Sequence, residues 1–286
     1  MKPKSNLSKI LKNRNLKIGM SLFGFFLFLV ALSYVAAPYS YQDVFPDFQL
    51  AAPFWKAAGT SQFWLGTDDL GRDLLSRLLV GARFSVGIGV VSTVFSILIA
   101  ASLGIISAYY KGRTDKIVNQ IMESLQAVPS LLLALIVIVV LGSGLINTIL
   151  SVTIVALPSM YRLVRSAAMV EVSKEYIQAS EALGASDLRI MLQHLLPNCL
   201  TPILVQSAVC FSDAVLNTAA LGFLGLGVQP PYPEWGTMLS DAKNFIEVAP
   251  WLMTIPGFCL LLLILSTQLI SDGLRDQLDP KLRNRT

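Results

Sequence analysis

Charged residues are scarce in this chain of 286 residues: only 14% are Asp, Glu, Lys or Arg, whereas 54% are hydrophobic. So little polar surface cannot cover a water-soluble globule of this size, which excludes a soluble domain. A Ser-His-Asp triad or a metal cluster would have to be built around the single histidine, His194, and no nearby residues in the sequence support either. The three cysteines are odd in number and scattered, which argues against a disulfide framework. We therefore expect a membrane protein with no catalytic residue and no metal site.

Long apolar runs confirm the expectation of a membrane protein. A helix needs roughly 20 apolar residues to cross the hydrocarbon core of a bilayer. Runs of that length occupy residues 18–37, 84–110, 124–161, 195–228 and 248–271. The third run is too long for one span and contains the Gly142-Ser-Gly144 break, so we divide it into two helices. The sequence thus predicts an all-α membrane protein with six transmembrane helices.

The positive charges are distributed unevenly between the loops. With the amino terminus inside, 17 of the 22 Lys and Arg residues fall on the cytoplasmic side, as the positive-inside rule requires. The charge therefore indicates topology and not binding of nucleic acid. We expect a multi-pass membrane protein, in contact with lipid, with both termini cytoplasmic. Its predicted parts are a basic tail (1–17), the first helix and outer loop (18–79), a core of five helices (80–273) and a carboxyl-terminal tail (274–286).

Two outer segments carry local signals. Residues 66–77 predict an amphipathic helix with Thr67 as N-cap and with Asp68 and Asp69 in its first turn. The proline-rich stretch from Pro230 to Gly236 predicts a rigid outer loop. This loop either shapes an outer gate or receives a partner, or it is a plain interfacial anchor that uses Trp235.

Polarity returns between residues 162 and 198, where two short helices are expected. Ser173 is placed to begin the first, Gly184 to end it in a left-handed conformation, and Ser186 to begin the second. Residues 171–198 would then form an elbow in the cytoplasm, whose small residues let a partner approach the backbone while Tyr176 and Leu183 offer apolar anchors. The alternative is an amphipathic hairpin that lies on the membrane or folds onto its own bundle.

The elbow resembles the coupling segment of permease subunits from binding-protein-dependent ABC importers. That pattern runs E-A-A, three residues, G, nine residues, I-x-L-P. Aligned on Gly184, this chain has Gln178-Ala179-Ser180 and then His194-Leu195-Leu196-Pro197. It departs from the pattern at Gln178, Ser180 and His194. Further strings resemble the second permease of dipeptide and oligopeptide importers: LGTDDLGRDLLSRLLVGAR, LPNCLTPILVQ, ALGFLGLGVQPPYPEWGTMLSDA and SDGLRDQLDPK.

The resemblance implies the type I ABC importer architecture with a cytoplasmic coupling-helix elbow, and a place in the bacterial plasma (inner) membrane. It also implies three kinds of partner: a second permease in a heterodimer, two ABC ATPase subunits and an extracytoplasmic solute-binding protein. The chain has no G-x-x-x-x-G-K-[ST] run, so we expect no bound cofactor, with ATP and Mg²⁺ on the partner ATPases. The residues expected to contact the ATPase are Glu175, Tyr176, Ala179, Leu183, Gly184, Ala185 and Ser186. The expected cargo is dipeptides or short peptides, although similar permeases import haem, nickel chelates or antimicrobial peptides.

Asp213 is the only acidic or basic side chain inside a predicted span, with Gln206 and Asn217 on the same helix. An intramembrane carboxylate usually faces a cavity or a partner. We consider two interpretations: these residues line the translocation pathway, where Asp213 meets a cationic group of the cargo, or Asp213 bonds to the partner permease or stays protonated between helices. An ion-coupled secondary transporter would need several intramembrane charges, and a membrane-embedded hydrolase would need paired catalytic groups.

Overall fold

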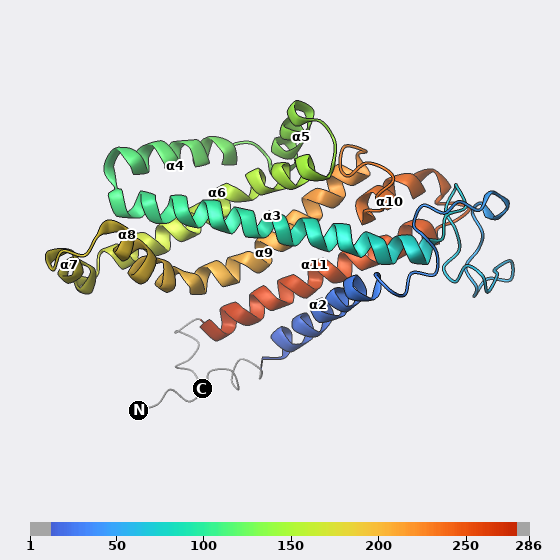
Figure 1. Ribbon diagram of the computed structural model, residues 1–286, viewed down its shortest axis with the longest axis horizontal. Coiled ribbons are helices and arrows are strands. Elements are labelled where there is room, and N and C mark those ends of the chain that lie inside the picture. The colour runs from blue at the N-terminus through green and yellow to red at the C-terminus, as the bar shows by residue number, and fades with distance from the viewer. Residues whose placement is uncertain (1–12, 279–286) are drawn as a thin grey trace.

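The computed structural model describes residues 13–278, and that part of the chain contains helices but no β-strand. The helices form an elongated bundle with short helices at both ends (Figure 1). The long ones are α2 (Arg14–Leu32), α3 (Leu74–Tyr110), α6 (Leu145–Val172), α9 (Leu196–Phe223) and α11 (Trp251–Leu278). The shorter ones are α4 (Gly112–Gln126), α5 (Ser130–Leu141), α7 (Glu175–Ala182), α8 (Asp187–Ile190) and α10 (Trp235–Ala242).

Five helical runs are long and apolar enough to cross a membrane, and α4 with α5 gives a sixth if that bent pair counts as one span. The axis turns by 96° between α4 and α5. Pro129 lacks a backbone N–H and restricts the residue before it, so the chain cannot continue as a regular helix there. The predicted break between the third and fourth spans is confirmed, since Gly142 and Gly144 have φ values of 88° and 142°. The prediction of six spans holds, with the third one bent.

Small side chains bring α3 close to α6. A Cβ atom on Gly104 would lie 3.0 Å from the backbone nitrogen of Arg165. The hydroxyl of Ser96 donates to the carbonyl of Thr153 over 3.2 Å. Because lipid provides no hydrophobic force between helices, close packing and such hydrogen bonds hold them together. Gly104 and Ser96 therefore let α3 and α6 pack closely at these positions.

The first helix, α2, is anchored along α11 by two glycines. A Cβ atom on Gly19 would lie 2.7 Å from the carbonyl oxygen of Ser266, and one on Gly273 would lie 2.6 Å from the Cβ of Leu16. The start of α2 and the end of α11 lie on the same side of the bundle as α7 and α8 (Figure 1). That placement agrees with an even number of crossings between them.

The predicted amphipathic helix over residues 66–77 is wrong. Helix α3 begins at Leu74, and its N-cap is Asp73, whose carboxylate accepts a hydrogen bond from the backbone of Ser76 over 2.8 Å. Gly71 has a φ of 81°, which breaks any helix before that point. Thr67 is fully buried, and its hydroxyl donates to the carbonyl of Phe48. It therefore anchors the outer loop and caps no helix.

Candidate functional site

The elbow projects from one end of the bundle as α7, a tight turn and α8 (Figure 1). Helix α7 ends in a Schellman motif, in which the N–H of Ala185 donates to Ser180 and the N–H of Gly184 donates to Glu181. Gly184 has the left-handed φ of 81° that this motif requires. Ser186 is the N-cap of α8, as predicted, whereas the first helix begins at Glu175 because Ser173 still belongs to the end of α6.

The elbow leaves its tip open to solvent. Leu183 is 89% exposed and Leu188 is 63% exposed, although both are apolar. Ile177 and Ile190 are fully buried and hold the elbow to the bundle. Of the residues predicted to contact an ATPase, only Ala185 is half-buried. The other six are exposed: Glu175, Tyr176, Ala179, Leu183, Gly184 and Ser186. The alternative in which this tip folds onto its own bundle is therefore wrong.

A polar cluster ties the two arms of the elbow together. The buried carboxylate of Glu171, at the end of α6, accepts hydrogen bonds from Lys174 over 2.6 Å and from the hydroxyl of Tyr176. The side chain of Asn198, at the start of α9, donates to the same hydroxyl over 3.2 Å. Burial and the hydrogen bond to Glu171 raise the pKa of Tyr176 to about 12. Although Tyr176 is 39% exposed, its hydroxyl also links the end of α6 to the start of α9, a role that the sequence did not indicate.

The second arm of the elbow runs without a break into a membrane helix. Residues 187–223 form one continuous helical run, in which Met191–Leu195 is a π-helical segment between α8 and α9. Pro197 follows this segment, and a proline ring clashes with the carbonyl four residues earlier unless the helix widens. The ring of His194, 6.0 Å from that of Tyr176, packs there. The second arm of the elbow and α9 are therefore parts of one helical run.

Helix α9 carries two of the three predicted pathway residues to one cavity. Asp213 and Asn217 line a cavity of about 360 Å³ where the bend between α4 and α5 faces α6 and α9. Gln206, two turns earlier on α9, does not line it. The remaining polar residues around the cavity are Gln126, Ser130 and Ser159, all uncharged.

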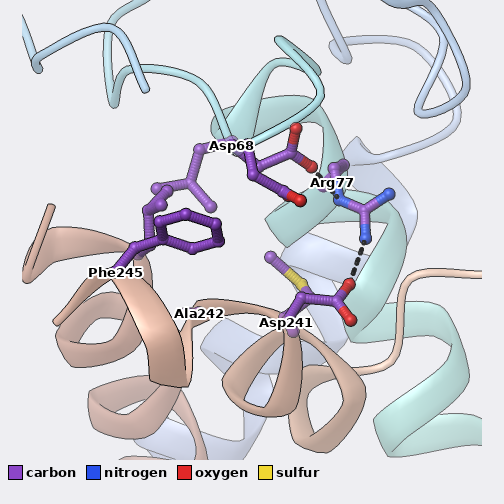
Figure 2. Close-up of a pocket in the computed structure, with 9 residues that line it drawn as sticks. Asp68, Arg77, Asp241, Ala242 and Phe245 are labelled. Carbon is purple, nitrogen blue, oxygen red and sulfur yellow. Dashed lines mark ion pairs between the residues drawn. The ribbon is translucent and has the colours of Figure 1, made fainter. Parts of the chain in front are cut away.

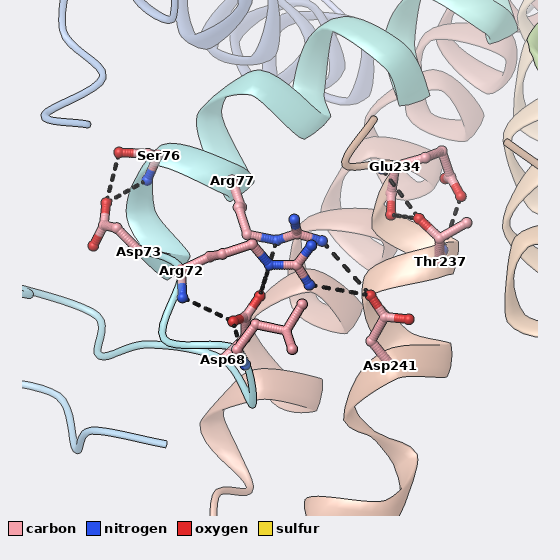
Figure 3. A network of polar contacts seen from close by, with 9 residues as sticks. Asp68, Arg72, Asp73, Ser76, Arg77, Glu234, Thr237 and Asp241 are labelled. Carbon is pink, nitrogen blue, oxygen red and sulfur yellow. Dashed lines mark hydrogen bonds and ion pairs between the residues drawn. The ribbon is translucent and has the colours of Figure 1, made fainter. Parts of the chain in front are cut away.

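A charged network (Figure 3) lies at the end of the bundle where α10 is found, opposite the elbow (Figure 1). The guanidinium of Arg77, only 4% exposed, lies between Asp68 at 3.3 Å and Asp241 at 3.6 Å. Arg72 pairs with the same two carboxylates, at 2.7 Å and 3.8 Å. Asp68, Arg77 and Asp241 border a small cavity next to Phe245 (Figure 2), whose volume of about 10 Å³ fits no more than one water molecule. This network fastens the start of α3 to α10.

The proline-rich stretch ends in a buried helix start. Glu234 and Thr237 form a capping box for α10, and the carboxylate of Glu234 also accepts a hydrogen bond from Ser85 over 3.1 Å. Burial raises the pKa of Glu234 above its ordinary value. Trp235 is fully buried, and its indole donates to the carbonyl of Leu78 over 3.1 Å. The interpretation of Trp235 as an interfacial anchor is therefore wrong, because this side chain belongs to the core.

Comparison with known families identifies one match. Residues 100–284 match the model of the family described as "Binding-protein-dependent transport system inner membrane component". In solved structures, inward-facing conformations of the MetNI methionine ABC transporter resemble this chain with a TM-score of 0.57 and 21% identity, over 71% of this chain and 97% of the other. That likeness shows the fold to be that of an ABC importer permease.

Curated relatives are similar over most of their length. The di/tripeptide transport system permease protein DppC of Pseudomonas aeruginosa is 49% identical over 87% of this chain and 82% of the relative. The dipeptide transport system permease protein DppC of Escherichia coli is 44% identical over 95% of this chain and 91% of the relative. The glutathione transport system permease protein GsiD of Pectobacterium atrosepticum is 37% identical over 91% of this chain and 86% of the relative.

Proposed function

Because this chain belongs to the family of inner-membrane components of binding-protein-dependent transport systems, we propose that it is one of two permease subunits of an ATP-driven importer of dipeptides. It forms a heterodimer with the second permease, takes cargo from an extracytoplasmic solute-binding protein and binds no nucleotide. ATP and Mg²⁺ are held by two partner ATPases. The identity of 49% to a di/tripeptide permease supports an ordinary short peptide as cargo over the γ-linked tripeptide glutathione, whose permease is 37% identical.

The exposed elbow tip is the observation that carries this function. Two large apolar side chains, Leu183 at 89% and Leu188 at 63%, are exposed on this projection, and grouped apolar surface of this kind marks a contact for a partner. The tip therefore lies in the cytoplasm and docks on an ATPase. When the ATPases close around ATP, the elbow moves as a rigid body with α9, and the cavity at Asp213 changes its access from one side of the membrane to the other.

The test is reconstitution of the chain in proteoliposomes with its partner permease, ATPases and binding protein. Uptake of a labelled dipeptide is expected to require both ATP and the binding protein. Leu183→Asp should abolish uptake and release the ATPases, whereas Val44→Asp, at a site 50% exposed in the outer loop, should do neither. Uptake that follows an ion gradient without ATP would contradict the proposal and favour a secondary transporter.

A further inference from the structure

The cavity beside Asp213 has the dimensions of a ligand site. Its volume of about 360 Å³ lies at the lower end of the range of roughly 300–1,000 Å³ found for small-molecule sites. Its walls come from four helices and from the Val128-Pro129 bend. The apolar wall is formed by Leu125, Leu133, Val152, Val155 and Leu216. Mostly apolar walls with a few convergent polar groups are typical of a site for a small organic molecule.

Asp213 brings the only charge to this cavity. Its side chain is exposed, and its carboxylate has no hydrogen-bond or ion-pair partner among the described residues. Asn217 donates to the backbone carbonyl of Asp213 and leaves the carboxylate free. Arg162 on α6 donates to the side chain of Gln126 and does not line the cavity. A carboxylate in a membrane span is costly to keep there unless something compensates its charge.

We propose that Asp213 receives the α-ammonium group of a short peptide inside this cavity. The inference rests on the proposed function and names the part of the cargo that this subunit recognises. An ammonium group offers three donors, and the cavity presents the carboxylate of Asp213, with Asn217 and Ser159 as further polar groups in its wall. A divalent metal ion suits this set poorly, because Ca²⁺ or Mg²⁺ needs six or more oxygen ligands. Asp213 is exposed, so that cargo held there can also leave.

The first experiment measures uptake by the complete complex in proteoliposomes. Asp213→Asn is expected to lower uptake of dialanine about tenfold, as loss of a hydrogen bond to a charged group does. Hydrolysis of ATP stimulated by the loaded binding protein should persist. The double variant Asp213→Asn/Asn217→Asp places a carboxylate in the same cavity one helical turn further along α9, and it should recover most of the uptake. Unchanged uptake in Asp213→Asn, or no recovery in the double variant, would overturn the inference.

The second experiment tests the ammonium group itself. Binding of labelled dialanine and N-acetyl-dialanine is measured on the detergent-purified complex without the binding protein. Weak, saturable binding of dialanine is expected, lost in Asp213→Asn and not shown by the acetylated peptide. Equal binding of both peptides, or of neither, would overturn the inference. Loss of the partner permease from purified Asp213→Asn would assign the carboxylate to the subunit contact instead. A wild-type complex without ATP-dependent uptake would contradict the proposed function itself.

Discussion

The hydroxyl of Tyr109, near the end of α3, lies 3.0 Å from Oδ1 of Asp187, the first residue of α8. The neighbouring Tyr110 donates to the other oxygen of the same carboxylate over 3.1 Å. Two consecutive tyrosines of one helix therefore hold the start of the second arm of the elbow. Since α3 also packs along α6 and α9, this contact links the elbow to the centre of the bundle.

Removing both hydroxyls should weaken the link without unfolding the protein. The double variant Tyr109→Phe/Tyr110→Phe loses two exposed hydrogen bonds, so its stability should fall by only about 1 kcal/mol. Its dipeptide uptake should fall several-fold while ATP hydrolysis continues, because motion of the ATPase is no longer passed on fully. Uptake and hydrolysis are measured together in proteoliposomes. Tyr232→Phe, which removes a hydroxyl outside the elbow, is the control, and an equal effect there would contradict the assignment.

Gly184 is required for its backbone conformation and not for space. A Cβ atom there would meet nothing within 4 Å, but the φ of 81° strains any residue other than glycine or, to a lesser degree, asparagine. Gly184→Ala should cost about 1–2 kcal/mol of local stability and reduce co-purification of the ATPases. Gly184→Asn should retain them. If the two variants behave alike, the left-handed turn does not position the contact.

The stability of the protein should depend on pH through Glu234. Burial raises the folded-state pKa of this group above its ordinary value of 4.5. The folded state therefore holds the proton more tightly than the unfolded state, and this contribution is fully present below pH 4.5 and is lost as the pH rises through the folded-state pKa. Thermal unfolding of wild type and Glu234→Gln, measured by fluorescence across this interval, should show the wild type losing stability relative to the variant. Parallel curves would contradict a raised pKa.

Anchoring of α2 on α11 should fail when Gly19 acquires a side chain. Gly19→Leu places atoms where the backbone of α11 lies, so it should cost about 1–3 kcal/mol and make α2 accessible to protease in detergent. Gly24 is the matched control on the same helix, because a Cβ atom there meets nothing within 4 Å. Cleavage patterns that are the same for Gly19→Leu and Gly24→Leu would contradict the close packing.

Arg77 should contribute more to the stability of the folded protein than its neighbour Asp69 does. Arg77→Gln removes the buried one of the two cations that Asp68 and the half-exposed Asp241 share, and leaves them only Arg72. Breaking a buried pair costs about 3–5 kcal/mol, and exposure of Asp241 reduces this to roughly 2–3 kcal/mol. Asp69→Asn, which borders the same small cavity, should change the unfolding temperature little. Thermal unfolding of the two variants compares them, and a smaller loss in Arg77→Gln would count against the network.

Sequence patterns predicted the parts of this fold that local chemistry controls. The break at Gly142 and Gly144 and the turn at Gly184 require φ values that glycine adopts readily, and both were found where the glycines stand. The patterns failed where tertiary contacts decide. Thr67 looked like an N-cap, but its hydroxyl is used by the outer loop, and Asp73 caps α3 instead.

The candidate site was likewise predicted only in part. The exposed residues of the elbow follow from helix caps and small side chains, which a sequence displays directly. Other contacts could not be predicted in this way. The ion pair of Arg77 with Asp241 joins residues far apart in the chain, and the hydrogen bond between Glu171 and Tyr176 and the burial of Trp235 depend on how neighbouring helices pack. No periodicity in one segment reports such contacts, although the carboxylate of Asp213 inside a span did indicate a cavity.

Accessibility of position 183 tests the central claim most directly. Leu183→Cys, in a chain whose Cys199, Cys210 and Cys259 are replaced by Ala, is treated with a membrane-impermeant maleimide in right-side-out vesicles. We expect no labelling until the vesicles are opened, and then labelling that bound ATPase blocks. Labelling of intact vesicles would place the elbow outside the membrane and contradict the account.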